Sequence, residues 1–325
     1  MSDRGEDVAG FPQASLRDYI AIARPDHWTK HVFIVPGIML AFVLRDDASL
    51  NTLPLALGFA SAAAVSSANY VINEWLDRSF DAHHPTKSRR TAVTIALSPK
   101  IVYGEYALLA CLGLVCSYFV SQLFVLASIA FLISGLIYNV EPLRTKDKPY
   151  LDVLSESLNN PIRLILGWSM VDGTTLPPSS VLIAYWMGGA FLMGAKRLSE
   201  YREIGAASGK ELLARYRRSF HHYNEERLLL SIFAYAMMTA FFIAVFFVKY
   251  RSEYILAFPA VVWMFATYFI LSLKADSVAQ RPEKLFRERY LMITVSTTVV
   301  LLVGLTFVDI PALDFVSEPH FIMLR

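Results

Sequence analysis

Long apolar stretches with almost no charge recur along this chain between about residue 31 and residue 308. Most approach the roughly 20 residues that an α-helix needs to cross the hydrocarbon core of a membrane. Only 18% of the residues are Asp, Glu, Lys or Arg, whereas a soluble domain has about 25%. The sequence therefore predicts an all-α, polytopic membrane protein and excludes a soluble globular domain.

We expect nine transmembrane helices, at about residues 31–44, 53–76, 101–117, 122–138, 152–170, 180–195, 228–248, 254–273 and 290–308. The first is short, and we expect Pro36 and Gly37 to kink it. No Gly/Ser linker or low-complexity run divides the chain, so we expect one helical domain over residues 31–308. Residues 1–30 lack the continuous apolar core of a signal peptide.

The distribution of basic residues predicts the orientation of the helices. An N-terminus in the cytoplasm places 25 of the 30 Lys and Arg residues on the cytoplasmic side, in agreement with the positive-inside rule. We therefore expect a multi-pass protein of the inner (plasma) membrane. Residues 1–30 are then cytoplasmic, and the short tail 309–325 is not.

Four polar residues recur every fourth position at the end of the second predicted helix: Asn69, Asn73, Asp77 and Asp81. This spacing stacks them along one helical face. Oxygen ligands of this kind suit Mg²⁺, which proteins hold through one or two carboxylates together with substrate phosphates. The alternative, that they are interfacial residues where a helix leaves the membrane, explains Asp81 well but Asn69 and Asn73 poorly.

A second polar face opens the fifth predicted helix and comprises Asp152, Glu156, Asn159 or Asn160, and Arg163. Two acidic helices on one side of the membrane can bind one diphosphate through two metal ions. Arg163 lies about eight residues into the helix, where an unpaired charge is costly, and we expect Glu156 to be its partner. The alternative for Arg163 is an ion pair that only holds the helices together.

Three basic segments on the predicted cytoplasmic side are suited to phosphate oxygens. The first contains Lys87 and Arg89, whereas the positive-inside rule alone explains Arg90. The second runs from Tyr138 to Lys148, and the third is an expected loop of about 30 residues that begins at Lys196.

These segments together resemble the UbiA superfamily of intramembrane transferases over essentially residues 20–310. Within it, the chain is most similar to the decaprenyl-phosphate phosphoribosyltransferases, or 5-phosphoribose-1-diphosphate synthases, of the cell-wall lipid pathway. Four segments carry this resemblance: Arg24 to Lys30, Asn73 to Asp81 with His84 to Lys87, Leu151 to Leu154 with Arg163, and Lys196-Arg197 with Glu200.

The resemblance implies a UbiA-like helical bundle whose cavity opens to the cytoplasm and an Mg²⁺-dependent reaction. The expected catalytic residues are Asp77, Asp81, Asp152 and Lys87. The expected metal ligands are Asn73, Asp77, Asp81, Asp152 and Glu156. The residues expected to bind substrate are Lys30, Asn69, Lys87, Arg89, Tyr138, Arg144, Arg163, Lys196 and Arg197.

Two reactions fit this resemblance, and we expect the first, with the second as its alternative. The first transfers 5-phosphoribose from phosphoribosyl diphosphate to a polyprenyl phosphate, and the second transfers a prenyl group from a prenyl diphosphate to a ring acceptor. Three departures from the phosphoribosyl subgroup bear on this choice: Glu74 where Asp is usual, the segment Glu141 to Arg144, and the polar run Ser155 to Pro161. The last two favour the second reaction.

A transporter for an anionic lipid or metabolite is the interpretation from another functional class. It would need polar groups at the midplane of two repeated halves, and the last three predicted helices offer no such path. The expected partners are therefore the lipid substrate, the diphosphate donor and membrane lipids, with no nucleic acid. Homo-oligomerisation is left open.

Overall fold

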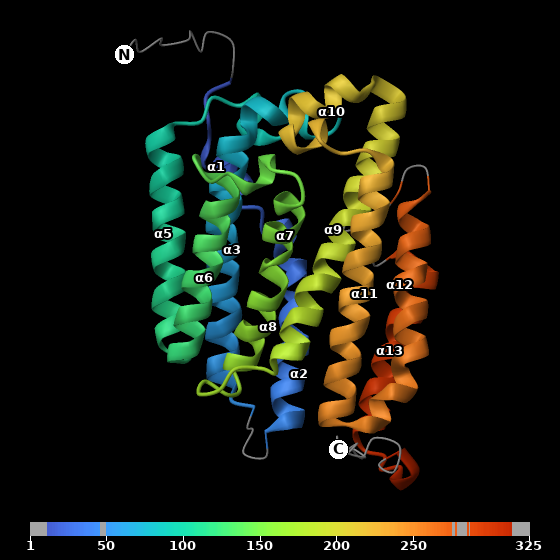
Figure 1. Ribbon diagram of the computed structural model, residues 1–325. Helices are drawn as coiled ribbons and strands as arrows, with labels where there is room; N and C mark the ends of the chain where they lie inside the picture. The colour runs from blue at the N-terminus through green and yellow to red at the C-terminus, as the bar shows by residue number, and fades with distance from the viewer. Residues whose placement is uncertain (1–11, 46–49, 275–276, 278–284, 286, 314–325) are drawn as a thin grey trace, which may run out of the picture. The chain divides into compact units, whose positions relative to one another are not determined.

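The computed structural model describes residues 12–45, 50–274, 277, 285 and 287–313, and it contains helices and no β-strand within these ranges (Figure 1). The all-α prediction is confirmed for this part of the chain. Residues 1–11 of the predicted N-terminal segment and 314–325 of the predicted tail lie outside it. So does most of the segment 274–289, which connects the last two predicted spans.

The helices fall into two compact units. The first unit comprises residues 1–176 and 204–223, and the second comprises residues 177–203 and 224–325. The single helical domain over residues 31–308 stays a prediction.

The first unit begins with a helical segment, and its elements follow in chain order. They are α1 (Leu16–Ile22), the 3-10 helix η1 (Pro25–Ile34), α2 (Val35–Leu44), α3 (Thr52–Asp81), η2 (Lys87–Arg89), α4 (Thr91–Thr94), α5 (Pro99–Tyr118), α6 (Gln122–Asn139), η3 (Thr145–Asp147), α7 (Leu151–Ser157), α8 (Asn159–Ser169), α10 (Lys210–Tyr216) and η4 (Arg218–His221).

Helix α3 packs against both α5 and α6, which lie side by side in Figure 1. A chain of serines joins the three helices. The Ser61 hydroxyl lies 2.8 Å from that of Ser117, which lies 2.9 Å from that of Ser128. All three side chains are buried. Small hydroxyl residues are common where membrane helices meet, since they allow close approach and hydrogen-bond across the contact.

Helix α8 packs against α2 and the end of η1 through two glycines. A methyl group at Gly167 would collide with the backbone carbonyl of Ile34, and one at Gly37 would collide with that of Leu164. Glycine is therefore required at this contact so that the two backbones can touch. This contact fixes α8, and with it Arg163, against η1 and α2.

The second unit contains the first part of α9 (Ser179–Ser208), then α11 (Glu225–Tyr250), the 3-10 helix η5 (Ser252–Ala257), α12 (Phe258–Ser272) and α13 (Arg289–Thr306). Asn224 caps α11, because its Oδ1 accepts a hydrogen bond of 2.7 Å from the Arg227 backbone N–H. Phe191 of α9 packs against Phe265 of α12, with the ring centroids 4.9 Å apart.

Seven helical segments of the described chain are long and apolar enough to cross a membrane: Leu16–Leu44, Thr52–Asp81, Pro99–Tyr118, Gln122–Asn139, Glu225–Tyr250, Ser252–Ser272 and Arg289–Thr306. They coincide with seven of the nine predicted spans. The other two correspond to α7–α8 and to the first part of α9. The count of nine, and the side of the membrane on which each loop lies, stay predictions.

Three local predictions are wrong. The first span is not a kinked α-helix over 31–44, because a 3-10 helix ends at Ile34 and Pro36 then lies in the first turn of α2. The fifth predicted helix is divided into α7 and α8 at Leu158. The loop expected to begin at residue 196 begins instead after Ser208, since α9 continues to that residue.

The contact between α8 and η1 can be tested by a glycine substitution. We expect Gly167→Ala to destabilise the protein by about 1–3 kcal/mol, the usual cost of overpacking, because the added methyl group meets a backbone atom that cannot turn away. Thermal melting of the purified protein in detergent measures the change. Gly104→Ala is the matched control, since open space surrounds Gly104. A melting temperature unaltered by Gly167→Ala would contradict the close contact.

Candidate active site

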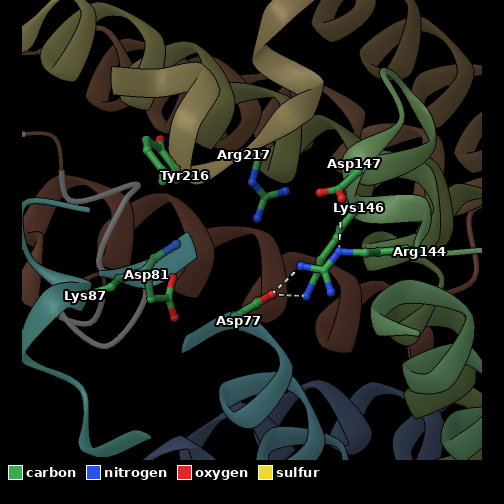
Figure 2. Close-up of a pocket in the computed structure, with 8 residues that line it drawn as sticks. All are labelled: Asp77, Asp81, Lys87, Arg144, Lys146, Asp147, Tyr216 and Arg217. Carbon is green, nitrogen blue, oxygen red and sulfur yellow. Dashed lines mark hydrogen bonds and ion pairs between the residues drawn. The ribbon is translucent and has the colours of Figure 1, made fainter. Parts of the chain in front are cut away.

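Eight residues of the first unit line an open pocket (Figure 2). Three of them are acidic, four are basic and one is aromatic: Asp77, Asp81, Asp147, Lys87, Arg144, Lys146, Arg217 and Tyr216. The excess of basic side chains makes this pocket attractive to a multiply charged anion.

Helix α3 supplies two of the three carboxylates of this pocket, one turn apart at its end. Asp77 and Asp81 follow Asn73 on the same face, as the four-residue spacing predicts. The Asn73 amide donates to Asp77 Oδ2 (3.2 Å) and to Asn139 Oδ1 of α6 (2.5 Å). Asn73 thus holds the first carboxylate and ties it to the neighbouring helix.

Two basic side chains that follow α6 pair with Asp77. Arg144 Nη2 lies 3.0 Å from Asp77 Oδ1, and the Lys146 ammonium donates to the same oxygen. Asp147 orients Arg144 from the other side, at 3.0 Å from its Nε (Figure 2). The Arg144 backbone is left-handed (φ 25°), a conformation that costs energy for a residue other than glycine and is often found at functional sites.

The second carboxylate, Asp81, pairs with Arg90 rather than with a predicted substrate residue. Arg90 Nη1 lies 2.6 Å from Asp81 Oδ2, whereas Arg89 is exposed. The attribution of Arg90 to the positive-inside rule alone is therefore wrong. Lys87 does line the pocket. Its turn is organised by buried His84, whose Nδ1 accepts hydrogen bonds from the backbone N–H groups of Thr86 (3.2 Å) and Lys87 (3.3 Å).

Arg217 connects the pocket to α6 and α7. It donates to the Tyr138 hydroxyl (3.3 Å), which in turn donates to Glu156 Oε2 (2.9 Å). Arg163 lies elsewhere, with its guanidinium over the ring of Phe131. The predicted ion pair between Glu156 and Arg163 is therefore wrong, because Glu156 accepts a hydrogen bond from Tyr138 and Arg163 packs on Phe131.

Asp152 is completely buried and is not among the residues that line the pocket. Its Oδ1 accepts a hydrogen bond from the Tyr223 hydroxyl (2.6 Å) and its Oδ2 accepts one from Ser219 (3.1 Å). Arg217 Nη1 is 3.5 Å from the same Oδ2. These contacts indicate that Asp152 fastens the segment 216–223 to α7. Its role as a metal ligand stays a prediction, as does that of Glu156.

The remaining predicted substrate residues do not line this pocket. Lys30 Nζ lies 3.1 Å from His27 Nδ1 and above the ring of Tyr70. Asn69 donates to the carbonyl of Phe131 (2.8 Å).

Lys196 and Arg197 belong to α9 in the second unit, not to a loop. Arg197 is buried and forms an ion pair of 3.0 Å with Glu200, one turn further along the same helix. Arg197 thus forms an ion pair within its own helix.

The donor set of the pocket fits Mg²⁺. Asp77 and Asp81 offer hard oxygen ligands one helical turn apart, together with the amide of Asn73. Within the described residues no group of three or more His, Cys, Asp or Glu side chains gathers to hold a metal ion. The bound ion would thus need oxygens from another source, which substrate phosphates typically supply to Mg²⁺.

Sequence reasoning missed Arg217 and Tyr216 as pocket residues and did not single out Lys146 and Asp147 within the basic segment Tyr138 to Lys148. The run Arg215 to Arg218 was a signal, but it offers three arginines and no means of choosing among them. Lys146 and Asp147 follow α6 in a basic loop, where the positive-inside rule already accounts for a lysine.

The sequence profile of the UbiA prenyltransferase family matches residues 34–307. The chain belongs to the UbiA prenyltransferase family. Its members are transferases, so the predicted family and enzyme class are confirmed.

The UbiA relatives differ in their named activities. The chain is 26% identical to nodulation protein NoeC of Azorhizobium caulinodans over 62% of its length, and spans 64% of that protein. It is 24% identical to decaprenyl-phosphate phosphoribosyltransferase of Mycolicibacterium smegmatis, over 74% of both chains. It is 28% identical to protoheme IX farnesyltransferase of Alkalihalophilus pseudofirmus, over 61% of this chain and 65% of that one.

Solved structures support the UbiA fold. A UbiA homologue from Archaeoglobus fulgidus, determined with GPP and Mg²⁺ bound, matches with a TM-score of 0.66 and 21% identity, over 90% of this chain and 100% of that one. Digeranylgeranylglyceryl phosphate synthase matches with a TM-score of 0.61 and 13% identity, over 90% and 99% of the two chains.

The two possible roles of Asp152 predict different phenotypes. If Asp152 fastens the segment 216–223, Tyr223→Phe removes one of its hydrogen bonds and should reproduce part of the effect of Asp152→Asn. We expect both variants to weaken binding of inorganic diphosphate several-fold, with an unchanged Mg²⁺ requirement, in titrations of the purified protein. An increased Mg²⁺ requirement in Asp152→Asn alone would instead favour the metal-ligand role.

The pH dependence of anion binding tests the charge on Lys146. Burial lowers the pKa of the Lys146 ammonium to about 8, against the opposing effect of Asp77. Lys146 is therefore charged below this pH and loses its charge as the pH rises through it. We expect the affinity for inorganic diphosphate to fall between about pH 8 and pH 10 in the wild type. In Lys146→Arg the fall should be much smaller, because arginine stays protonated. The same fall in both proteins would show that another group titrates.

Proposed function

We propose that this protein is an Mg²⁺-dependent transferase that moves 5-phosphoribose from phosphoribosyl diphosphate to a polyprenyl phosphate and releases diphosphate. The observation that carries the proposal is the pocket of Figure 2, where Asp77 and Asp81 face Lys87, Arg144, Lys146 and Arg217. Carboxylates for a metal and guanidinium or ammonium groups for phosphate oxygens are the two requirements of a metal–diphosphate site.

In the proposed reaction, an oxygen of the acceptor phosphate forms a bond to C1 of the ribose as the bond from C1 to the diphosphate oxygen breaks. The leaving diphosphate takes the electron pair of that bond, so its negative charge increases in the transition state. When bound, Mg²⁺ supplies neutralisation of that charge.

The protein side chains contribute charge and position to this step. Asn73, Asp77 and Asp81 would hold the metal, and Arg144 and Lys146 would turn from Asp77 to the diphosphate oxygens. Once turned, these donors are in place before the bond to C1 breaks, so they stabilise the developing charge without reorganising solvent. Lys87 and Arg217 would complete the ring of positive charge around the leaving group.

A sugar donor is supported by the number of basic residues around this pocket. Phosphoribosyl diphosphate carries a second phosphate at its far end, whereas a prenyl diphosphate ends in an apolar tail. Arg218 lies beyond the pocket, 3.7 Å from Asp147 and over the ring of Phe80. Together with exposed Arg89, it offers charge to a distal phosphate. The similarity to the decaprenyl-phosphate phosphoribosyltransferase supports the same choice.

The second candidate is prenyl transfer from a prenyl diphosphate to a ring acceptor. Its specific support is Arg144, which lies in the pocket and ends the segment Glu141 to Arg144, the segment that resembles ring-prenylating members of the family. The similarity to a protoheme IX farnesyltransferase adds to it. The metal and the diphosphate would occupy the same places in both reactions.

Mass spectrometry of lipids formed by the purified protein tests the proposal. With Mg²⁺, phosphoribosyl diphosphate and decaprenyl phosphate, we expect a phosphoribosylated lipid and free diphosphate, with neither formed when the lipid is omitted. Ribose 5-phosphate should compete, since it keeps the distal phosphate, and geranyl diphosphate should compete poorly. Asp77→Asn is the control and should retain less than about a tenth of the rate, a loss above roughly 1.4 kcal/mol.

The opposite pattern would favour the second candidate. Turnover of a prenyl diphosphate with an aromatic acceptor, combined with no response to phosphoribosyl diphosphate, would overturn the phosphoribosyl proposal. A folded Asp77→Asn variant that keeps most of the wild-type rate would overturn the assignment of the metal site in either reaction.

A further inference from the structure

Arg163 of α8 is a buried cation that the pocket of Figure 2 does not use. Its side chain is 8% exposed, and its Nε is buried without a hydrogen-bond partner among the described residues. The guanidinium carbon lies 5.1 Å from the centre of the Phe131 ring, a contact that offsets only part of the cost of removing a cation from water. A charge kept in such surroundings is expected to serve function rather than stability.

A second incompletely paired group also contacts Phe131. The Asn69 amide donates to the Phe131 carbonyl (2.8 Å), while its Oδ1 is buried without a hydrogen-bond partner among the described residues. Gly135 makes room for this side chain, since a methyl group there would collide with the Asn69 amide. A donor on Arg163 and an acceptor on Asn69 thus belong to two residues that both contact Phe131, and each atom lacks a hydrogen bond that it could make.

The helices place this pair well away from the diphosphate pocket. On α3, Asn69 precedes Asp77 by eight residues, which is about 12 Å along a helix. On α6, Phe131 precedes Tyr138 by seven residues, or about 10 Å. Tyr138 accepts the hydrogen bond of Arg217, a pocket residue. Both helices therefore set the pair about two turns below the pocket.

The segment formed by α7 and α8 also places Arg163 away from the pocket. Glu156 of α7 lies at the level of the pocket, because it accepts a hydrogen bond from Tyr138. Arg163 follows it by seven residues on α8, in the direction away from the pocket. Three separate stretches of chain thus agree that Arg163 cannot contact the same phosphate groups as Lys146 and Arg144.

We propose that Arg163, with Phe131 and Asn69, forms the subsite for the acidic head of the acceptor. The ligand would be an oxyanion that also carries an O–H group, so that the oxyanion pairs with Arg163 and the hydroxyl donates to Asn69 Oδ1. A singly protonated phosphate monoester and a hydroxylated ring carboxylate both meet this description. For the choice of phosphate, the inference rests on the function proposed above.

The geometry of the reaction explains why this subsite is separate. In a displacement at carbon, the attacking oxygen and the leaving oxygen lie on opposite sides of the reacting atom. The protein must therefore hold the acceptor head and the diphosphate with different groups, one set on each side of that carbon. Arg163 and the pocket cations are arranged in this way, at two levels of one bundle of helices.

Binding measurements without turnover test the subsite. Decaprenyl phosphate and 4-hydroxybenzoate are titrated separately into the purified full-length protein in nanodiscs, without donor. We expect Arg163→Met to weaken binding of at least one of them ten-fold or more and to leave the affinity for Mg²⁺-diphosphate within two-fold. Arg45→Met is the matched control, since it removes a guanidinium paired with Asp172, and it should change none of these affinities.

The identity of the affected ligand separates the subsite from the proposed function. Loss of decaprenyl phosphate binding in Arg163→Met supports both the subsite and the proposed function. Loss of 4-hydroxybenzoate binding alone supports the subsite and overturns phosphoribosyl transfer to a lipid. Failure of turnover with phosphoribosyl diphosphate, together with binding that depends on Arg163, likewise removes the proposed function and leaves the subsite.

Two outcomes would overturn the subsite itself. The first is wild-type protein that binds neither compound, and the second is Arg163→Met that binds both as tightly as the wild type. If Arg163→Met does not fold, the same titrations with Arg163→Lys test the subsite. We expect several-fold weaker binding, because lysine lacks the planar fork that grips an oxyanion with two bonds. Unchanged affinities in Arg163→Lys would then assign Arg163 to helix packing.

Discussion

The buried contact between Asp77 and its two cations, Arg144 and Lys146, is the interaction on which the arrangement of the pocket depends. A carboxylate at the end of a membrane helix cannot remain charged unless opposite charge surrounds it. The chain provides that charge from the turn after α6, which therefore has to fold back onto α3. Asn73 and Asn139 then join the two helices beside the pair. Charge compensation inside the protein thus brings together the residues that a metal–diphosphate complex would need.

Sequence periodicity predicted the part of this site that belongs to one helix. The four-residue spacing of Asn73, Asp77 and Asp81 follows from the geometry of an α-helix, and the structure has it. Periodicity carries no information about which side chain from another element will meet these residues. For this reason the sequence could not choose Arg90 over Arg89, nor single out Arg217 among the arginines near it.

The same limit explains the errors at helix ends. The sequence places the end of α9 near residue 195, because apolar residues stop there and a membrane helix was expected to stop with them. The helix continues to Ser208, since a charged stretch can stay helical where its side chains pair along the helix, as Arg197 does with Glu200. The division between α7 and α8 was missed as well, because a break at Leu158 leaves no glycine in the sequence to mark it.

The attachment of the segment 216–223 has a consequence for how molecules enter and leave. Tyr223 and Ser219 are bound to the interior of α7 through Asp152, while Arg217 and Tyr216 reach into the pocket. Swinging this segment outward as a rigid flap would expose an unpaired carboxylate that is now completely buried. The entry and exit of molecules past this segment therefore cost less free energy when individual side chains rotate than when the backbone moves. The backbone of the segment 216–223 is thus held in place, while the side chains of Tyr216 and Arg217 can change rotamer.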